Sequence, residues 1–146
     1  MQIIIMRGLP GSGKTSWHKR FHPNAIVCSA DDFHTVNGIY KFQPTNAGIA
    51  HRTCLRKYLE AFFTPSAATL IVDNTNTTLM ELSRYVEPAL AFGYDPRIVF
   101  MPCEIKESVR RNIHGVPPST ITKMYANLIN EVLPPYWKQD FIYEGI

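Results

Sequence analysis

The sequence predicts an α/β fold: a parallel sheet of four to five strands flanked by helices. Four apolar runs, rich in Ile and Val, alternate along the chain with stretches of helical periodicity. The runs are almost free of polar residues, which is typical of parallel strands covered on both faces. Strands that alternate with helices favour right-handed crossovers in a single sheet. The four predicted strands are Gln2–Met6, Ala25–Ser29, Thr69–Asp73 and Arg97–Met101.

Five stretches between or after these strands have the periodicity and end signals of helices. They are Lys14–Phe21, Asn46–Phe63, a stretch capped by Thr77 or Thr78 that ends at Gly93, Glu104–Ile113 and Ser119–Leu133. Two segments, Phe33–Thr45 and His114–Pro118, are expected to be irregular, the second as a lid. The aromatic stretch Tyr136–Tyr143 is expected to pack back on the domain, with an edge strand as one option.

Composition predicts one domain, residues 1–146, in the cytoplasm. The chain is 45% hydrophobic and 18% charged, as in ordinary globular proteins, and its net charge of +3 permits a nucleic-acid partner without requiring one. Three cysteines without a C-x-x-C spacing indicate neither a disulfide framework nor a zinc site. The N-terminus reads as a core strand rather than a signal peptide, and no apolar run is long enough for a membrane span.

A glycine-rich loop with the pattern G-x-x-x-x-G-K-T occupies Gly8–Thr15, between the first predicted strand and the first predicted helix. Its glycines allow backbone N–H groups to surround a polyphosphate at a helix N-terminus. Lys14 would reach the outer phosphates, and Thr15 would hold Mg²⁺, with Asp73 as a second metal residue. The predicted nucleotide-binding residues are Gly8, Pro10, Gly11, Ser12, Gly13, Lys14, Thr15, Ser16 and Arg111.

The rest of the chain indicates which class of phosphate-loop protein this is. The sequence contains neither the D-x-x-G nor the N-K-x-D of GTPase switches. Asp73 is followed by Asn74, not by the glutamate with which hydrolytic ATPases activate water. A kinase needs a carboxylate that accepts a proton from the acceptor hydroxyl, and cations over the transferred phosphoryl group. The remaining polar residues fit these two requirements.

Asp31 is the predicted general base, because it follows the second strand and strand ends meet at the edge that carries the phosphate loop. The alternative is that Asp31 and Asp32 only cap a turn. Arg110 or Arg111 would supply the catalytic cation, and the following lid favours Arg111. The alternative for these arginines is a solvated face with i,i+4 pairing.

Several histidine and aromatic residues have two interpretations each. His18 and His22, one helical turn apart, are predicted to form a surface pair. His51 either points to an acceptor cleft or is a hydrogen-bonded core residue. Aromatic residues of the irregular loop either stack on nucleic-acid bases or bury the loop against the second long helix. These aromatic residues are Phe33, Tyr40 and Phe42.

Four motifs resemble the bacteriophage-type polynucleotide 5′-hydroxyl kinases: the phosphate loop, S-A-D-D-F at 29–33, V-D-N-T-N at 72–76 and R-N at 111–112. The segments G-I-Y-K-F at 38–42, A-H at 50–51, R-N-I-H-G-V-P at 111–117 and I-T-K-M at 121–124 are similar to a related branch. That branch comprises the polynucleotide-kinase-like modules of a ubiquitin-ligase-binding protein and its short relatives. The resemblance covers residues 1 to about 133 in the same order.

The resemblance implies a role for each matching residue. Lys14 and Thr15 match phosphate and magnesium ligands, Asp31 the base, and Arg111 the lid arginine that clamps the donor phosphates. It also implies ATP as phosphoryl donor and the 5′-OH end of DNA or RNA as acceptor. The predicted substrate-binding residues are Asp32, His34, Asn74, Thr75, Asn76 and His51.

His34 departs from the pattern, because the bacteriophage enzymes have an arginine there that contacts the acceptor phosphate. Histidine lacks the bidentate fork of a guanidinium. The acceptor could therefore be a hydroxymethyl pyrimidine in DNA, a free nucleoside or another small molecule. A further alternative is a module that binds nucleic-acid ends with nucleotide but does not transfer phosphate.

Overall fold

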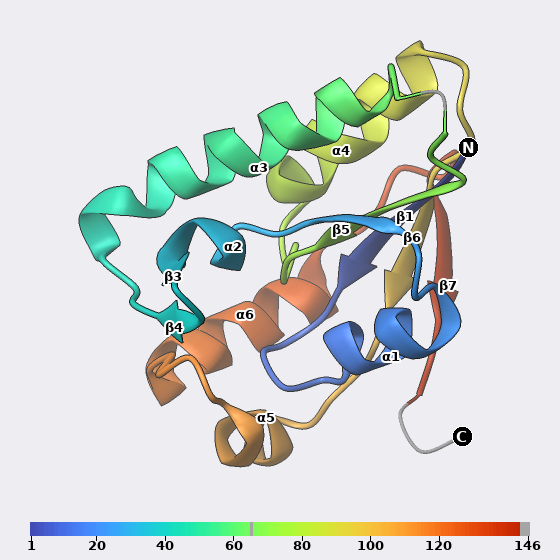
Figure 1. Cartoon of the computed structure of the whole chain (residues 1–146). Coiled ribbons are helices and arrows are strands. Elements are labelled where there is room, and N and C mark those ends of the chain that lie inside the picture. Colours follow the sequence, from blue (N-terminus) through green and yellow to red (C-terminus); the bar gives the residue numbers. More distant parts are fainter. Residues whose placement is uncertain (65, 144–146) are drawn as a thin grey trace.

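The computed structural model describes residues 1–64 and 66–143 and has the predicted α/β architecture (Figure 1). Five parallel strands form one sheet in the order β2-β5-β1-β6-β7. The first strand therefore lies in the centre, and the strand that leads to Asp31 lies at one edge. The strands are β1 (Gln2–Arg7), β2 (Ile26–Cys28), β5 (Thr69–Asp73), β6 (Arg97–Phe100) and β7 (Lys138–Phe141).

Helices cover both faces of this sheet. The helices are α1 (Lys14–Phe21), α2 (Asp31–His34), the 3₁₀ turn η1 (Pro44–Asn46), α3 (Ala47–Ala61), α4 (Leu79–Ala91), α5 (Ile105–Arg111) and α6 (Pro118–Asn130). Alternate residues of β1 face opposite sides: Ile3 and Ile5 pack with α3 and α4, whereas Ile4 and Met6 pack with Trp17 of α1. Burial on both faces explains why residues 3–6 of β1 are all apolar.

The start of α4 confirms the predicted cap. The Thr78 hydroxyl accepts a hydrogen bond from the Glu81 backbone N–H at 3.2 Å, and the Glu81 carboxylate accepts one from the Thr77 N–H at 3.0 Å. This pair resembles a capping box, with the Glu81 side chain reaching the residue before the N-cap. Gly93, just after the helix, has φ +82°, which suits glycine at a helix end.

The aromatic C-terminal stretch packs on the domain, and part of it is the edge strand β7. The Arg97 guanidinium and the Asp140 carboxylate pair at 2.7 Å across β6 and β7. The buried Trp137 indole donates to Glu87 of α4 at 2.9 Å. These contacts join the end of the chain to both the sheet and a helix.

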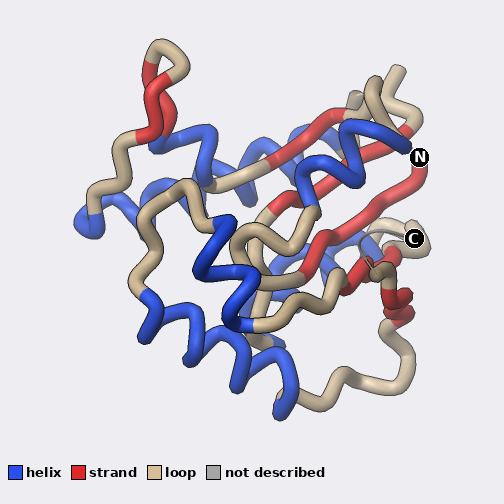
Figure 2. The backbone as a smooth tube through the Cα atoms, turned by 90° about the horizontal axis from the view of Figure 1, so that it is seen from below, coloured by secondary structure: helices blue, strands red, loops and turns tan. Residues whose placement is uncertain are grey.

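The segment Phe33–Thr45, predicted to be irregular, instead contains a hairpin of β3 (Thr35–Val36) and β4 (Ile39–Tyr40). Asn37 and Gly38 connect the strands with φ values of +53° and +77°. Two positive φ angles in a two-residue loop define the turn that Asn-Gly favours, a signal the sequence interpretation missed. Figure 2 shows the hairpin as an arm, upper left, that stands out from the five-stranded sheet.

In the part of the chain that the structure describes, no helix combines the length and apolarity needed to cross a membrane. The cytoplasmic location stays a prediction.

Candidate active site

Three glycines shape the phosphate loop between β1 and α1. Gly8 has φ +153°, and a Cβ there would lie 2.7 Å from the Met101 carbonyl oxygen. Gly11 has φ +74°, and a Cβ there would lie 2.8 Å from the Cβ of Arg111. Gly13, at φ +101°, leads into α1. The loop is thus held against the chain after β6 on one side and against the end of α5 on the other. The Ser108 hydroxyl of α5 also donates to the Pro10 carbonyl at 2.6 Å.

Lys14 is buried at the bottom of the loop. Its ammonium group donates to the carbonyls of Gly8 at 3.0 Å and Leu9 at 2.8 Å. Burial lowers the pKa of Lys14 to about 8, although the charges of Asp73 and Asp31 act to raise it. A phosphate bound beside Lys14 would therefore strongly stabilise the charged form of this buried lysine.

Asp73, at the end of β5, is held by two side chains of α1. Its Oδ2 accepts hydrogen bonds from the Thr15 hydroxyl at 2.7 Å and lies 2.8 Å from His18 Nε2. Burial acts to raise the pKa of the Asp73 carboxyl, but the hydrogen bonds from His18 and Thr15 and the charge of Lys14 together hold it below its ordinary value. The carboxylate is ionised, beside a hydroxyl, and this oxygen donor set suits Mg²⁺.

His18 is therefore not half of a surface pair, as the sequence interpretation had it. The residue is 3% exposed and faces the sheet, whereas His22 contacts Trp17. The signal lay in the spacing: His18 follows Lys14 by four residues and so shares its face of the helix.

Asp31 begins α2, directly after β2. Its backbone N–H donates to Ser29 Oγ at 3.2 Å, and the preceding Ala30 N–H donates to Asn74 Oδ1 at 2.9 Å. Asn74 follows β5, so its amide joins the ends of two neighbouring strands. Asp31 is thereby fixed at the sheet edge that carries the phosphate loop, as predicted.

The two candidate arginines of α5 occupy different positions. The Arg111 Nη1 lies 3.5 Å from the Gly11 carbonyl oxygen, over the phosphate loop, and its Nε lies 3.2 Å from Glu107. Arg110 points outward, with 66% of its side chain exposed, and pairs with Glu107 at 2.7 Å. Position therefore favours Arg111.

The loop after α5 is folded around the side chain of Asn112. Its Oδ1 accepts from the N–H groups of His114 and Val116, and its Nδ2 donates to the Val116 carbonyl at 2.6 Å. Gly115 follows with φ +68°. This turn directs His114 toward the sheet edge, where its Nδ1 lies 3.3 Å from Asp31 Oδ2.

A cavity of about 710 Å³ lies between the phosphate loop, α2, the β3–β4 hairpin and the loop after α5. Of the sequence-predicted site residues, it is lined by Pro10, Gly11, Gly13, Lys14, Thr15, Ser16, Asp31, His34, His51, Asp73, Asn74, Thr75 and Arg111. The phosphate loop with Asp73 forms one end, here named the phosphate-loop end. His34, Tyr40, Phe42 and His114 form the other, named the aromatic end.

Four predicted site residues do not line this cavity. Asp32 is exposed on the outer side of α2. Asn76 is 2% exposed, with φ +46°, and its amide donates to the Met6 carbonyl at 2.8 Å, so its position does not fit the predicted substrate contact. Gly8 and Ser12 support the phosphate loop without lining the cavity. The Gly8 N–H donates to the Thr75 carbonyl, and Ser12 is 1% exposed.

The aromatic side chains of the hairpin region pack on histidines. Tyr40 stacks on His114 with ring centroids 4.2 Å apart and planes at 17°. Phe33, Tyr40 and Phe42 contact the edges or faces of His34, which is 6% exposed. His114 was not singled out from sequence, because its nearest neighbours in space, Asp31 and Tyr40, lie more than 70 residues away along the chain.

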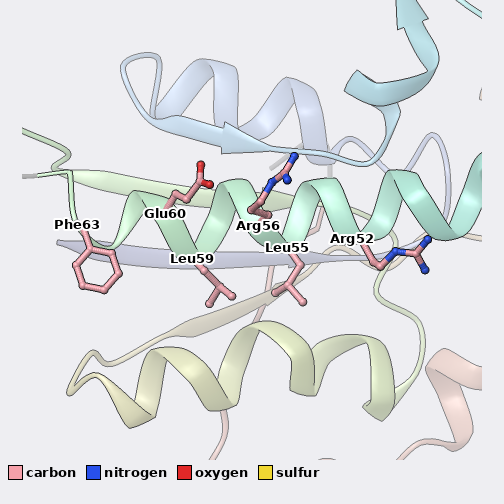
Figure 3. A pocket seen from close by; sticks show the side chains of 6 residues that line it. All are labelled: Arg52, Leu55, Arg56, Leu59, Glu60 and Phe63. Atoms are coloured by element: carbon pink, nitrogen blue, oxygen red, sulfur yellow. The ribbon is translucent and has the colours of Figure 1, made fainter.

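A second cavity, of about 340 Å³, runs along α3 and shares no lining residue with the first. Figure 3 shows Leu55 and Leu59 extending from α3 on the side of α4, with Arg56 and Glu60 on the opposite side. The remaining lining residues are Arg52 and Phe63. It brings no set of reactive groups together, so the first cavity is the candidate active site.

A family model described as an AAA domain matches residues 3–114, which include the phosphate loop, Asp31, Asp73 and Arg111. The chain belongs to this family. Human NEDD4-binding protein 2 is 34% identical over 131 residues, and the match covers 84% of this chain and 7% of that protein. The chain thus spans a small part of that relative.

Solved kinase structures share the fold. A sugar kinase from Janibacter sp. HTCC2649 superposes with a TM-score of 0.64 at 18% identity, covering 98% of this chain and 85% of that one. The Mycobacterium tuberculosis APS kinase CysC, in complex with AMPPNP and APS, superposes with a TM-score of 0.61 at 18% identity, covering 99% and 89%. The five-stranded parallel sheet with flanking helices is therefore a phosphate-loop kinase fold.

Proposed function

We propose that this protein is an ATP-dependent kinase that transfers the γ-phosphoryl group to a hydroxyl of a nucleic acid, namely the 5′-OH end of DNA or RNA. One observation carries the proposal: a half-exposed carboxylate, Asp31, lines the same cavity as the phosphate-binding Lys14 and Arg111. A protein that only binds nucleotide has no need of a carboxylate placed on the acceptor side of the phosphates.

The donor phosphates would lie at the phosphate-loop end. Helix α1 begins at Lys14, directly after the loop, so the free N–H groups of its first turn would face the phosphates. The Lys14 and Arg111 charges would stabilise the negative charge of the transferred group. Thr15 and Asp73 would hold Mg²⁺, which supplies further charge neutralisation when bound.

The step is a single displacement at phosphorus. The acceptor oxygen forms a bond to the γ-phosphorus while the bond from that phosphorus to the bridging oxygen of ADP breaks. Asp31 accepts the hydroxyl proton, and ADP departs with the bonding electron pair. Arg111, fixed by Glu107 and by the close approach of Gly11, lies beside the group in transit.

The nucleic-acid acceptor is supported by the motif resemblance to polynucleotide 5′-hydroxyl kinases. Aromatic side chains on the acceptor side are also typical of sites that bind nucleic-acid bases.

The position of His34 favours a second candidate. His34 replaces the arginine that contacts the acceptor phosphate in the bacteriophage enzymes, and it is buried among three aromatic rings. A site without that phosphate contact suits a hydroxymethyl pyrimidine within DNA or a nucleoside.

A panel of acceptors with γ-labelled ATP tests the proposal. The panel contains 5′-OH DNA, 5′-OH RNA, hydroxymethylated DNA with blocked ends, nucleosides and sugars. The proposal expects label on 5′-OH DNA or RNA. Label on hydroxymethylated DNA or nucleosides instead would select the second candidate, label only on sugars would place the protein among small-molecule kinases, and no labelled product with nucleic-acid binding retained would leave a binding module.

A further inference from the structure

The hairpin and the loop after α5 meet directly over the candidate base. These two segments, 35–40 and 112–117, are far apart in sequence, yet Tyr40 stacks on His114 with a centroid distance of 4.2 Å. The two rings are almost parallel, and their stack joins two segments that are otherwise anchored separately. The hairpin follows α2, and the loop after α5 is folded around the side chain of Asn112.

Both rings of this stack also reach the same carboxylate. His114 Nδ1 lies 3.3 Å from Asp31 Oδ2. The Tyr40 hydroxyl interacts with Asp31 as well; burial and then this carboxylate raise the pKa of Tyr40. With its side chain 47% exposed, Asp31 is covered on the acceptor side by two flat rings rather than by packed core.

Apolar side chains rim this stack on both sides. On the hairpin side Phe42 is 50% exposed, on the loop side Ile113 is 87% exposed, and both line the cavity. Exposed apolar groups gathered at the mouth of a cavity mark a place where a ligand or partner is covered. Because they come from two segments that meet at a ring stack, the ligand they suit is flat and partly apolar.

We propose that Tyr40 and His114 form the binding slot for the nucleobase of the acceptor: the rings part, the base stacks between them, and Asp31 is released from both to receive the acceptor hydroxyl. This proposal rests on the proposed function for the identity of the acceptor. Tyr40 and His114 contact the substrate in it, and Asp31 keeps its role as proton acceptor. Because every base can stack on an aromatic ring, this slot would bind the acceptor base without selecting among the four bases.

The test uses the full chain and a 5′-OH oligonucleotide whose terminal base is 2-aminopurine, a base whose fluorescence falls when it stacks. ADP with Mg²⁺ replaces ATP, so binding is measured without transfer. Wild-type protein should quench a terminal 2-aminopurine strongly and an internal one, several nucleotides away, weakly. Y40L should lose most of this quench and weaken oligonucleotide binding by about ten- to a hundredfold, the range of one lost base–aromatic stack.

Y40F keeps the ring and should keep the quench, and H114L should lose it as Y40L does. Tyr136→Leu makes the same chemical change at an exposed tyrosine outside the cavity and should behave as wild type. In the transfer reaction Y40L should raise KM for the oligonucleotide while leaving KM for ATP unchanged. The melting temperature of each variant shows that it is folded.

Equal quench and affinity in Y40L and wild type, or equal quench at terminal and internal positions, would overturn the slot. The two proposals fail separately. Transfer to a 5′-OH end without Tyr40-dependent quench refutes the slot and leaves the kinase. Tyr40-dependent quench without transfer to any acceptor refutes the kinase and leaves the slot. Absence of both refutes both.

Discussion

At the phosphate-loop end of the cavity, backbone groups of residues 8–15 are held by the central strand β1, by α1 and by α5. The aromatic end is made of side chains from α2, the hairpin region and the loop after α5. Gly8 and Gly11 each touch a neighbouring segment so closely that no Cβ fits. The aromatic end depends instead on contacts between side-chain rings and on the contacts of Asp31. A rigid donor site beside an acceptor site that can open is what a phosphoryl transfer between two substrates needs.

The largest effect is expected where the two ends meet, at Asp31. D31N should lower the transfer rate by roughly 10²- to 10⁴-fold, the range for removal of a general base, while ATP affinity changes little. Asp32→Asn is the matched control, since Asp32 is exposed outside the cavity, and should transfer at nearly the wild-type rate. Rate measurements at saturating ATP distinguish the two. A D31N protein with wild-type turnover would remove Asp31 from the chemistry.

The second-largest effect is expected at Arg111, and the neighbouring Arg110 of α5 serves as its control. Arg111→Ala should slow transfer by about 10²- to 10³-fold, because a preorganised charge over the reacting group is lost. Arg110→Ala removes an exposed arginine that also pairs with Glu107 and should change the rate less than about twofold. Comparison of kcat/KM for both variants checks this. Similar losses in both would mean that α5 acts through its overall charge.

A glycine pair tests the rigidity of the phosphate-loop end. Gly11→Ala and Gly93→Ala both place a side chain at positive φ, +74° and +82°, at a cost of about 1 kcal/mol of stability each. Only at Gly11 does the new Cβ meet another residue, Arg111 at 2.8 Å, whereas at Gly93 nothing lies within 4 Å. Denaturant unfolding should show the cost in both, but only Gly11→Ala should also weaken ATP binding, by about tenfold. Unchanged ATP affinity in Gly11→Ala would show that the loop and α5 are not rigidly joined.

The smallest expected effect is the uptake of a proton by Lys14 when Mg·ATP binds. Lys14 has a pKa of about 8, below its ordinary value because of burial, so above pH 8 much of the free protein carries it neutral. Bound phosphates favour the charged form, so binding of Mg·ATP at pH 8.5 should take up about 0.8 proton, and affinity should fall as the pH rises. Calorimetry in buffers of different ionisation enthalpy measures the uptake. At pH 6.5 Lys14 is already charged and uptake should be near zero; equal values at both pH would contradict this account of Lys14.

The difference between the two ends also explains what could be predicted from the sequence. The phosphate loop is local, so its residues and their strand-to-helix setting were readable from Gly8–Thr15. Asp31 was predicted because strand ends meet at one sheet edge. The prediction that Asn76 contacts the substrate was wrong, because a residue next to a motif can turn into the core. Its positive φ and its hydrogen bond to the Met6 carbonyl direct its side chain away from the cavity.

The aromatic end was predicted less well because it arises from contacts distant in sequence. The Asn37-Gly38 turn signal identifies a hairpin, but not which segment its Tyr40 will meet. His114 becomes part of the site only through the fold of the loop around Asn112. His18 was misjudged because its partner, Asp73, lies 55 residues away on another element.

The most direct test of the central claim is the chemical position of the phosphate in the product. A 5′-OH oligonucleotide is incubated with γ-labelled ATP, and the product is digested to nucleotides with a nuclease that releases 5′-monophosphates. The account predicts that the label is recovered in the terminal nucleotide as a 5′-monophosphate, and that D31N gives almost none. Label recovered only as inorganic phosphate, with the oligonucleotide unmodified, would contradict it.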